Sequence, residues 1–469
     1  LEGIAFMGRA VKILEDEPDW LSTLRLLGRK SFLDQPYEKN PLYVKNYERL
    51  SLDPEWLLNN TEPRSNTSIP SEYSDLLSII DEPIIIHMDA SPVRTHVPPK
   101  LSEKGLVLMS LEEALRKKPS YVKQALTEGP SGPEEDKLLG LIYASLNSGV
   151  LVIAPSGLDS PVSIRSIWLL GSNGPITSAA TIVYAGEGTR LSIIEEYHSY
   201  RLEETGFLGH IVQTYDAPES QIRHITINAV SEKSEVVTYR SSLVGNYASH
   251  KWIGIQLGGS LTRTRIDNYL DGAEARADTL EASMTSGDQR LDSTINLHHR
   301  AESTTGRVIS KAAAMQRSKA LLKGIIRIER RAKNSVAYLA EHAMLLSSES
   351  RAEAIPGLEI ECNEVRATHS ASVSQIDPEQ VWYMMTRGVP REEAVKIIAL
   401  GFFEPLISEV DAREVRWSMR YLLERKWLGD AGKTLEPGSL MDIYVEPEEA
   451  EKTPEDIFGK HYKYVRQRG

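Results

Sequence analysis

The amino-acid sequence predicts a mainly β protein in which a long central β region lies between two helical regions. From Gly149 to about Ser374, apolar and polar residues alternate with a period near two in short stretches separated by Gly, Asn, Asp and Ser turns. No convincing helical pattern interrupts this block, whereas helical patterns precede and follow it. A sandwich, a barrel or a parallel β-helix can each produce such a pattern. The length of the block makes a solenoid plausible, because each turn of a solenoid needs only its neighbours.

The first region, residues 1–148, is predicted to be mainly helical with loops. A helical pattern follows Trp20, and several prolines break the segment after it into short pieces. Residues 104–115 indicate a short strand that leads into a helix with Ser110 as its N-cap. Residues 136–146 predict the last helix before the β block.

The central region, residues 149–375, contains the strand candidates. They are short runs rich in β-branched and aromatic residues, bounded by turn residues. The candidates are residues 150–153, 181–184, 191–194, 221–227, 252–257, 261–266, 291–298, 324–328 and 335–339.

The C-terminal region, residues 376–469, is predicted to begin with a tight helical hairpin. Asp377 suits a helix N-cap, Pro378 suits the first helical position, and Gly388 suits the left-handed cap where that helix ends. Pro390 then opens a second helix, whose first turn carries acidic residues where the helix dipole favours them.

Two more features follow the hairpin. Residues 410–428 predict one further helix. Beyond Gly438 the chain is rich in Pro and Glu and ends in a basic stretch at residues 460–468, which is typical of a partly mobile extension.

The composition excludes several classes of protein. The 469 residues are 41% hydrophobic and 26% charged, as expected for an ordinary globular protein with two or three structural units. A net charge of −12 argues against nucleic acid or an anionic membrane as the main partner. The single cysteine excludes an intrachain disulfide framework and fits a reducing cytoplasm. No apolar run is long enough to span a bilayer, and no secretory signal is visible at the start.

One nucleotide-binding pattern can be rejected. Residues 432–434 read Gly-Lys-Thr, but a phosphate-binding loop needs a glycine five positions before that Gly, and Trp427 stands there. We therefore expect no ATP to be bound by this chain. The sequence also lacks paired CxxC motifs and the common zinc-protease and hydrolase motifs.

Three polar clusters receive a structural interpretation. Adjacent strand residues point to opposite faces, so His298 and His299 are predicted to be one inward histidine bonded to a nearby turn and one exposed histidine. Residues 195–198 (Glu-Glu-Tyr-His) and the pair Glu341 and His342 are predicted to be solvated strand and turn residues.

Residues 356–408 show a specific order of motifs. A strand-like run leads past Cys362 to Thr-His-Ser-Ala at 368–371, then to Ser-Gln-Ile-Asp, Thr-Arg-Gly, Glu-Glu-Ala and Gly-Phe-Phe. This order resembles the C-terminal signature of the SufB/SufD family, scaffold components of the SUF iron–sulfur cluster assembly machinery. Segments near residues 17–26, 104–115 and 136–157 also resemble that family, so the similarity covers most of the chain.

The resemblance implies a right-handed parallel β-helix core flanked by helical domains, and it implies a role for His369. Family members carry a functional histidine at this position, in a Glu-His-Glu setting in SufB-type chains and a Ser-His-Gly setting in SufD-type chains. Here the setting is Thr368-His369-Ser370, which is nearer the SufD pattern. His369 is therefore the expected ligand of a transient iron–sulfur cluster, and imidazole is a competent iron ligand.

The cysteine positions of the family are not matched. The functional cysteine of SufB-type chains falls near Ser350 here, and the cysteine that SufD-type chains often place before the histidine falls on Ala367. Cys362 matches neither position, although a thiolate could ligate iron. This favours a SufD-like chain that works beside a cysteine-bearing partner.

The resemblance also implies partners. In the family the C-terminal helical domain docks the SufC ATPase, and apolar or aromatic residues of the hairpin are candidate anchors, some facing inward and others facing the partner. The candidates for partner binding are Trp382, Tyr383, Arg387, Gly388, Phe402 and Phe403.

Three functional hypotheses follow. The first is a non-enzymatic scaffold subunit that works with a SufC-type ABC ATPase and a second SufB/SufD-type chain in the cytoplasm. The second is a self-sufficient homodimeric scaffold that uses Cys362 and His369. The third is a carbohydrate-active β-helix enzyme, against which the missing secretory signal and the helical hairpin both argue. The type of cluster, the choice between homodimer and heterodimer, and the subunit that accepts sulfur stay open.

Overall fold

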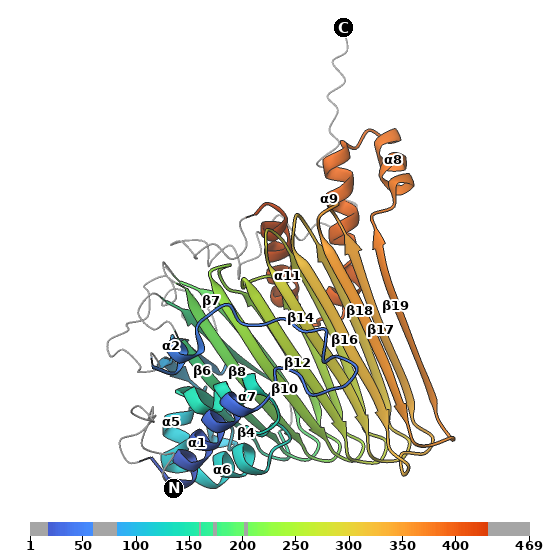
Figure 1. Cartoon of the computed structure of the whole chain (residues 1–469). Helices are drawn as coiled ribbons and strands as arrows, with labels where there is room; N and C mark the ends of the chain where they lie inside the picture. Colours follow the sequence, from blue (N-terminus) through green and yellow to red (C-terminus); the bar gives the residue numbers. More distant parts are fainter. Residues whose placement is uncertain (1–16, 60–81, 159–160, 172–175, 201–204, 430–469) are drawn as a thin grey trace.

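The chain folds around a long parallel β-solenoid with helices at both ends, as the computed structural model shows (Figure 1). The structure describes residues 17–59, 82–158, 161–171, 176–200 and 205–429. The Gly-Lys-Thr sequence and the C-terminal extension lie outside these residues. No helix in the described ranges is long and apolar enough to cross a membrane.

The helices lie in an N-terminal and a C-terminal group. They are α1 (Asp19–Asp34), α2 (Pro54–Asn59), α4 (Pro99–Glu103), α5 (Leu111–Lys117), α6 (Pro119–Glu128), α7 (Lys137–Ser145), α8 (Pro378–Thr386), α9 (Arg391–Gly401), α10 (Glu404–Ile407) and α11 (Arg413–Trp427).

The strands form two sheets that face each other across the interior. The ten-stranded sheet has the order β19-β17-β15-β13-β11-β9-β7-β5-β1-β2, and the nine-stranded sheet has the order β18-β16-β14-β12-β10-β8-β6-β4-β3. The strands are β1 (Ile84–Met88), β2 (Ser91–His96), β3 (Val107–Ser110), β4 (Ser148–Ala154), β5 (Val162–Leu170), β6 (Ile176–Ala185), β7 (Arg190–Ser199), β8 (Gly206–Asp216), β9 (Gln221–Ala229), β10 (Ser234–Val244), β11 (Ser249–Gln256), β12 (Leu261–Leu270), β13 (Arg276–Thr285), β14 (Arg290–His299), β15 (Thr305–Ala314), β16 (Lys319–Ile328), β17 (Val336–Leu345), β18 (Arg351–Ile360) and β19 (Arg366–Gln375).

The chain alternates between the two sheets from β4 onward, so each strand pairs in parallel with the strand two places along the chain. Side chains at paired positions therefore stack on one another along the solenoid, and alternate residues of each strand point into the interior. The predicted parallel solenoid is confirmed, together with its flanking helices.

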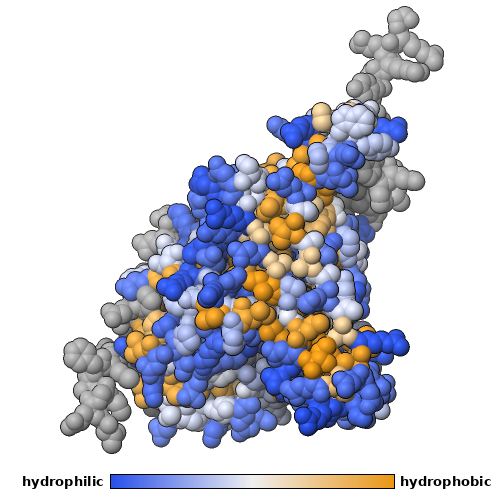
Figure 2. Space-filling view, turned by 45° about the vertical axis from the view of Figure 1, so that its right-hand side comes forward, coloured by the Kyte–Doolittle hydropathy of each residue, from blue (hydrophilic) through white to orange (hydrophobic). Residues whose placement is uncertain are grey.

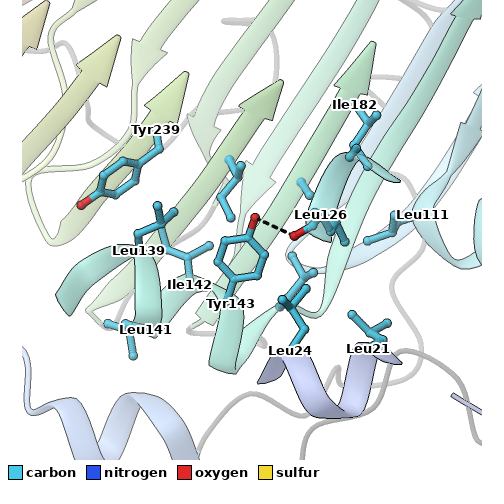
Figure 3. Close-up of a cluster of buried hydrophobic side chains, with 14 of the residues drawn as sticks. Leu21, Leu24, Leu111, Leu126, Leu139, Leu141, Ile142, Tyr143, Ile182 and Tyr239 are labelled. Carbon is cyan, nitrogen blue, oxygen red and sulfur yellow. Dashed lines mark hydrogen bonds between the residues drawn. The ribbon is translucent and has the colours of Figure 1, made fainter. Parts of the chain in front are cut away.

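The N-terminal helices cover the outer face of the nine-stranded sheet (Figure 1). Leu21, Leu24 and Leu126 of the helices pack with Ile182 and Tyr239 of the strands in one apolar cluster (Figure 3).

Helices α1 and α7 approach each other closely because both carry glycine at the crossing. A Cβ atom added to Gly28 would lie 2.7 Å from the carbonyl oxygen of Gly140, closer than a side chain tolerates. The N-cap that the sequence indicated at Ser110 is present, and its side chain accepts from the backbone N–H of Glu113. Asp136 is the N-cap of α7 and accepts from the backbone N–H groups of its first turn.

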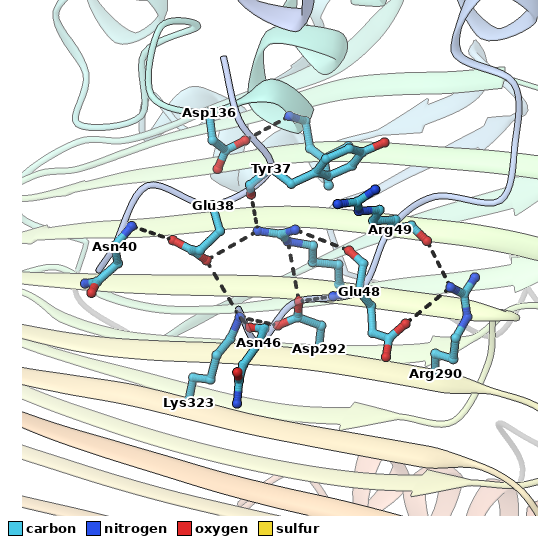
Figure 4. A network of polar contacts seen from close by, with 12 residues as sticks. Tyr37, Glu38, Asn40, Asn46, Glu48, Arg49, Asp136, Arg290, Asp292 and Lys323 are labelled. Atoms are coloured by element: carbon cyan, nitrogen blue, oxygen red, sulfur yellow. Dashed lines mark hydrogen bonds and ion pairs between the residues drawn. The ribbon is translucent and has the colours of Figure 1, made fainter. Parts of the chain in front are cut away.

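The segment between α1 and α2, residues 36–53, crosses the outer face of the nine-stranded sheet without regular structure, and we call it the strap (Figure 4). Buried charges hold the strap to the sheet. The Lys323 ammonium lies 2.7 Å from the Asp292 carboxylate, and Asp292 also accepts the backbone N–H of Glu48 at 3.0 Å. The Arg263 guanidinium donates to the backbone oxygen of Tyr37 at 2.7 Å. The strap thus ties the N-terminal helices to later turns of the solenoid.

The C-terminal helices divide into two parts. α10 and α11 pack on the outer face of the ten-stranded sheet, where Phe403, Leu406 and Met419 join a cluster with Ile225 and Ile253. The hairpin of α8 and α9 projects beyond the ends of the strands (Figure 1). The predicted helix at 410–428 is confirmed except at its start, because the four-residue helix α10 and a short loop come first.

Candidate functional site at the open end of the solenoid

The last turn of the solenoid is formed by β18 and β19, which are edge strands of the two sheets. No further strand among the described residues covers them, so backbone N–H and C=O groups along these edges are available for pairing. We call this surface the open end. Large hydrophobic side chains of these two strands are exposed there, namely Leu358, Ile360 and Val373. Figure 2 shows hydrophobic residues running across the molecule toward the helical hairpin.

His369 lies on β19 and faces the solenoid interior. Its position pairs with Leu339 of β17, which pairs with Val308 of β15, and both of these side chains are buried in the interior core. Residues paired in parallel strands share a face, so the imidazole points the same way. His369 is nevertheless exposed, because no turn follows to cover it. No described residue hydrogen-bonds the ring.

A buried carboxylic acid lies one turn below this imidazole. Glu341 of β17 faces inward beneath Ala371 of β19, and it is almost fully buried. Burial raises the pKa of Glu341 to about 8, although the nearby backbone of Ile355 and the charge of Lys323 act in the opposite direction. The side chain is thus a protonated acid at neutral pH, immediately inside the open end.

Cys362 lies in the turn between β18 and β19 and not on a strand. The residue is only 8% exposed and packs in the interior cluster that also contains Leu339. Cys362 and His369 thus belong to the same turn of the solenoid, but Cys362 behaves as a small core residue. Ser350, near which the resemblance places the cysteine of SufB-type chains, donates its hydroxyl to the backbone oxygen of Ser347.

Metal ligation by this chain alone finds little support in the geometry. Within the described ranges, no group of three or more His, Cys, Asp or Glu side chains could hold a metal ion.

The helical hairpin presents aromatic side chains to solvent. Trp382 is 65% exposed and Tyr383 is 55% exposed, whereas Val381 is the buried residue of α8. The guanidinium of Arg387 lies over the ring of Tyr383, 5.2 Å from its centroid, and donates to its hydroxyl at 3.1 Å. Gly388 follows with φ of +88°, the left-handed conformation that the sequence indicated.

Phe402 and Phe403 differ from these residues. Phe403 is 0% exposed and belongs to the core that joins the C-terminal helices to the ten-stranded sheet, so in this conformation it offers no surface to a partner. Phe402 is half-buried and lies under the ammonium of Lys311. The expectation of a partner contact therefore fits Trp382 and Tyr383 better than the Phe pair.

The prediction that residues 195–198 and Glu341 are solvated is wrong. Glu195, Glu196 and His198 are fully buried, and Glu341 is nearly so. Register explains the inward set: Glu195, Glu281 of β13 and Glu341 lie in one inward row of the ten-stranded sheet. Alternation within one strand cannot show which face lines the interior of a solenoid.

The buried carboxylates differ in their partners. Glu195 accepts hydrogen bonds from Thr181 and Tyr197, and His224 lies at 3.2 Å. Glu281 pairs with Arg240 at 3.1 Å. Within the described residues, both carboxylate oxygens of Glu341 lack a hydrogen-bond partner. The carboxyl group nearest the open end is therefore the least satisfied of the row.

The prediction for the histidine pair is half right. His299 is buried, and its Nδ1 lies 2.7 Å from the hydroxyl of Thr304 in the following turn, as expected. His298 is not fully exposed. It stacks on Tyr269 and lies 3.0 Å from the carboxylate of Asp267.

Comparison with known proteins agrees with this geometry. The family described as SUF system FeS cluster assembly, SufBD core domain, matches residues 169–402, which span the solenoid from β5 and the hairpin. An iron–sulfur cluster assembly SufBD family protein of Staphylococcus saprophyticus is 23% identical over 440 residues, 90% of this chain and 93% of that protein. The iron–sulfur cluster assembly protein SufD of Bacillus subtilis is 24% identical over 419 residues, 87% of this chain and 94% of that protein.

The fold and this match define a protein with a SufBD core, a parallel solenoid that ends in a helical hairpin. The chain belongs to the SufBD family.

Proposed function

We propose that the chain is a non-enzymatic scaffold subunit of a SUF-type iron–sulfur cluster assembly complex in the cytoplasm. The observation that carries this proposal is the imidazole of His369, which faces the interior row but lies uncovered at the open end. A ligand at an edge between subunits can hold a cluster as transient cargo, because the site opens when the subunits move apart. Family membership supports the same role.

Two exposed surfaces support the proposed partners. The open end, with unpaired strand edges and exposed apolar side chains, suits a second SufB/SufD-type chain, whose own edge strands can continue the sheets. The hairpin, with Trp382 and Tyr383 exposed, suits a SufC-type ABC ATPase. ATP hydrolysis belongs to that ATPase, and its dimerisation would shift the hairpin and strain the open end.

The self-sufficient homodimer is less well supported. It requires the thiol of Cys362 as a ligand, yet this side chain is 8% exposed within the apolar core. Ligation would require the turn between β18 and β19 to open.

The test is anaerobic cluster assembly by the whole complex, followed by visible absorption and by iron and sulfide content. We expect His369→Ala to remove most of the assembled cluster and Cys362→Ser to leave it nearly unchanged. The matched control is His342→Ala, which removes a neighbouring imidazole of β17 that points away from the interior. Unchanged assembly with His369→Ala would remove the ligand role, and equal losses for His369→Ala and Cys362→Ser would favour the homodimer.

A further inference from the structure

A second candidate site lies on the outer face of the ten-stranded sheet, away from the open end. A pocket of about 370 Å³ is formed where β7, β9, β11 and β13 begin. Leu191, Ile222 and His250 are among the residues that line it. The volume is within the range of small-molecule sites, roughly 300–1,000 Å³, and is too small for a folded partner.

The side chains around this pocket are mainly cationic. Arg190, Arg223, Lys251 and Arg276 line it, with Asp278 as the carboxylate among its lining residues. This concentration of positive charge is unexpected in a chain of net charge −12. Like charges held close together raise the free energy of the folded protein, and a bound anion would lower it.

Three of these charges already have partners. Arg223 pairs with Asp411, and Lys251 pairs with Glu409 at 2.5 Å. Asp278 pairs with Arg307 of β15 at 3.0 Å. The pairs of Arg223 and Lys251 join the loop between α10 and α11 to the rim of the pocket.

Arg190 and Arg276 are different. In the described part of the chain, neither guanidinium has a carboxylate partner, although both line the pocket. The register stacks Arg190, Gln221, Ser249 and Arg276 in one outward row. Three strand spacings separate the two arginines, about 14 Å at roughly 4.8 Å per strand.

This spacing limits the ligand. Two guanidinium groups anchored so far apart can both reach one anion only if their side chains lean toward each other. An anion with two charged groups then offers one group to each arginine, whereas a single small anion has to be shared by both. Guanidinium forks suit phosphate oxygens, which they bind in bidentate fashion. The Gln221 amide and the hydroxyls of Ser192 and Ser249 supply neutral donors between the arginines.

We propose that this pocket binds a small molecule through a diphosphate group, with Arg190 and Arg276 as the two anchoring cations. The site is independent of the open end and of the proposed scaffold role. Cluster assembly can therefore succeed or fail without affecting this inference.

The probe is inorganic pyrophosphate, titrated into the full-length chain by isothermal calorimetry at fixed ionic strength, with orthophosphate and citrate for comparison. We expect pyrophosphate to bind more tightly than either. Arg190→Gln and Arg276→Gln should each weaken binding about tenfold or more, because each removes hydrogen bonds from a charged donor. The matched control is Arg330→Gln, which changes an exposed arginine in the turn before β17 that forms no ion pair with a described residue.

Circular dichroism and the melting temperature of each variant show whether the fold is intact. We expect an intact fold because both arginines are exposed. Three results would overturn the proposal: no pyrophosphate binding to the wild type, undiminished binding by the double variant, or citrate binding as tight as pyrophosphate. A loss of binding with Arg330→Gln equal to that of the pocket variants would show only general attraction to positive charge, and would also overturn it.

Discussion

Several histidines are buried inside the solenoid, and burial sets their protonation state. Burial lowers the pKa of His87 to about 3 and that of His210 and His299 to about 4. These histidines are therefore neutral in the folded protein at pH 6, where an unfolded chain, with a histidine pKa near 6.5, is largely protonated. They take up protons only when the solenoid unfolds.

The pH dependence of stability follows from this difference. The unfolded chain binds more protons, so the free energy of unfolding is greatest above pH 6.5 and falls as the pH is lowered toward the folded pKa values. Each such histidine should lower the free energy of unfolding by about 1.5 kcal/mol as the pH falls from 6.5 to 5. The imidazole of His87 stacks on the indole of Trp168 with the ring centroids 4.0 Å apart, and His87→Phe keeps an aromatic ring at this position.

We expect His87→Phe to lose less stability between pH 7 and pH 5 than the wild type, as measured by urea unfolding at each pH. His96→Gln, on β2, is the control and should keep the wild-type dependence. An unchanged dependence in His87→Phe would mean that this imidazole is already protonated in the folded state.

The candidate site shows what could be predicted at this scale. His369 was found through motif order, and strand register then gave its direction, which no local pattern contains. Glu341 was missed because alternation assigns it to one face of a strand without saying that this face is the interior. Cys362 was kept as a candidate ligand although it matches neither cysteine position of the family, and its burial in the interior cluster could not be read from the sequence.

At the scale of elements, the sequence predicted helix ends best where a single capping residue determines the end. Asp377 caps α8 through the backbone N–H of Glu379, and Gly388 has the left-handed conformation that follows the helix. β1 and β2 were missed because they lie in the region predicted as helical, and β1 is completed by pairing with β5, far along the chain. The orientation of the hairpin could not be predicted either, because it depends on tertiary packing.

The hairpin makes a paired prediction. Trp382→Ala and Tyr383→Ala remove exposed rings, so each should change the free energy of unfolding by no more than about 0.5 kcal/mol while weakening binding of a SufC-type ATPase. Phe403→Ala removes a fully buried ring and should cost about 3–5 kcal/mol of stability. Urea unfolding and a pull-down with the ATPase separate the two effects. Strong ATPase binding by the Trp382 and Tyr383 double variant would show that the ATPase binds to another part of the chain.

At the scale of the molecule, the two ends of the solenoid differ in whether other elements cover them. The first turns are covered by the N-terminal helices and by the antiparallel strands β2 and β3, whereas the last turn ends at the uncovered edges of β18 and β19. The period of the sequence could not choose between a sandwich, a barrel and a solenoid, because all three alternate in the same way. The family resemblance predicted the solenoid correctly. The register gives the physical reason for its stability, because equivalent strand positions of successive turns stack on one another along its length.

The central claim is that the open end pairs with a second SufB/SufD-type chain while the hairpin binds the ATPase. Native mass spectrometry of the complex, co-expressed with both partners, tests it most directly. The test variant carries Leu358→Lys and Val373→Lys, two exposed apolar residues of the edge strands. We predict that this variant keeps the ATPase and loses the second SufB/SufD-type chain. A variant complex that keeps all its subunits in the wild-type ratio would contradict the account.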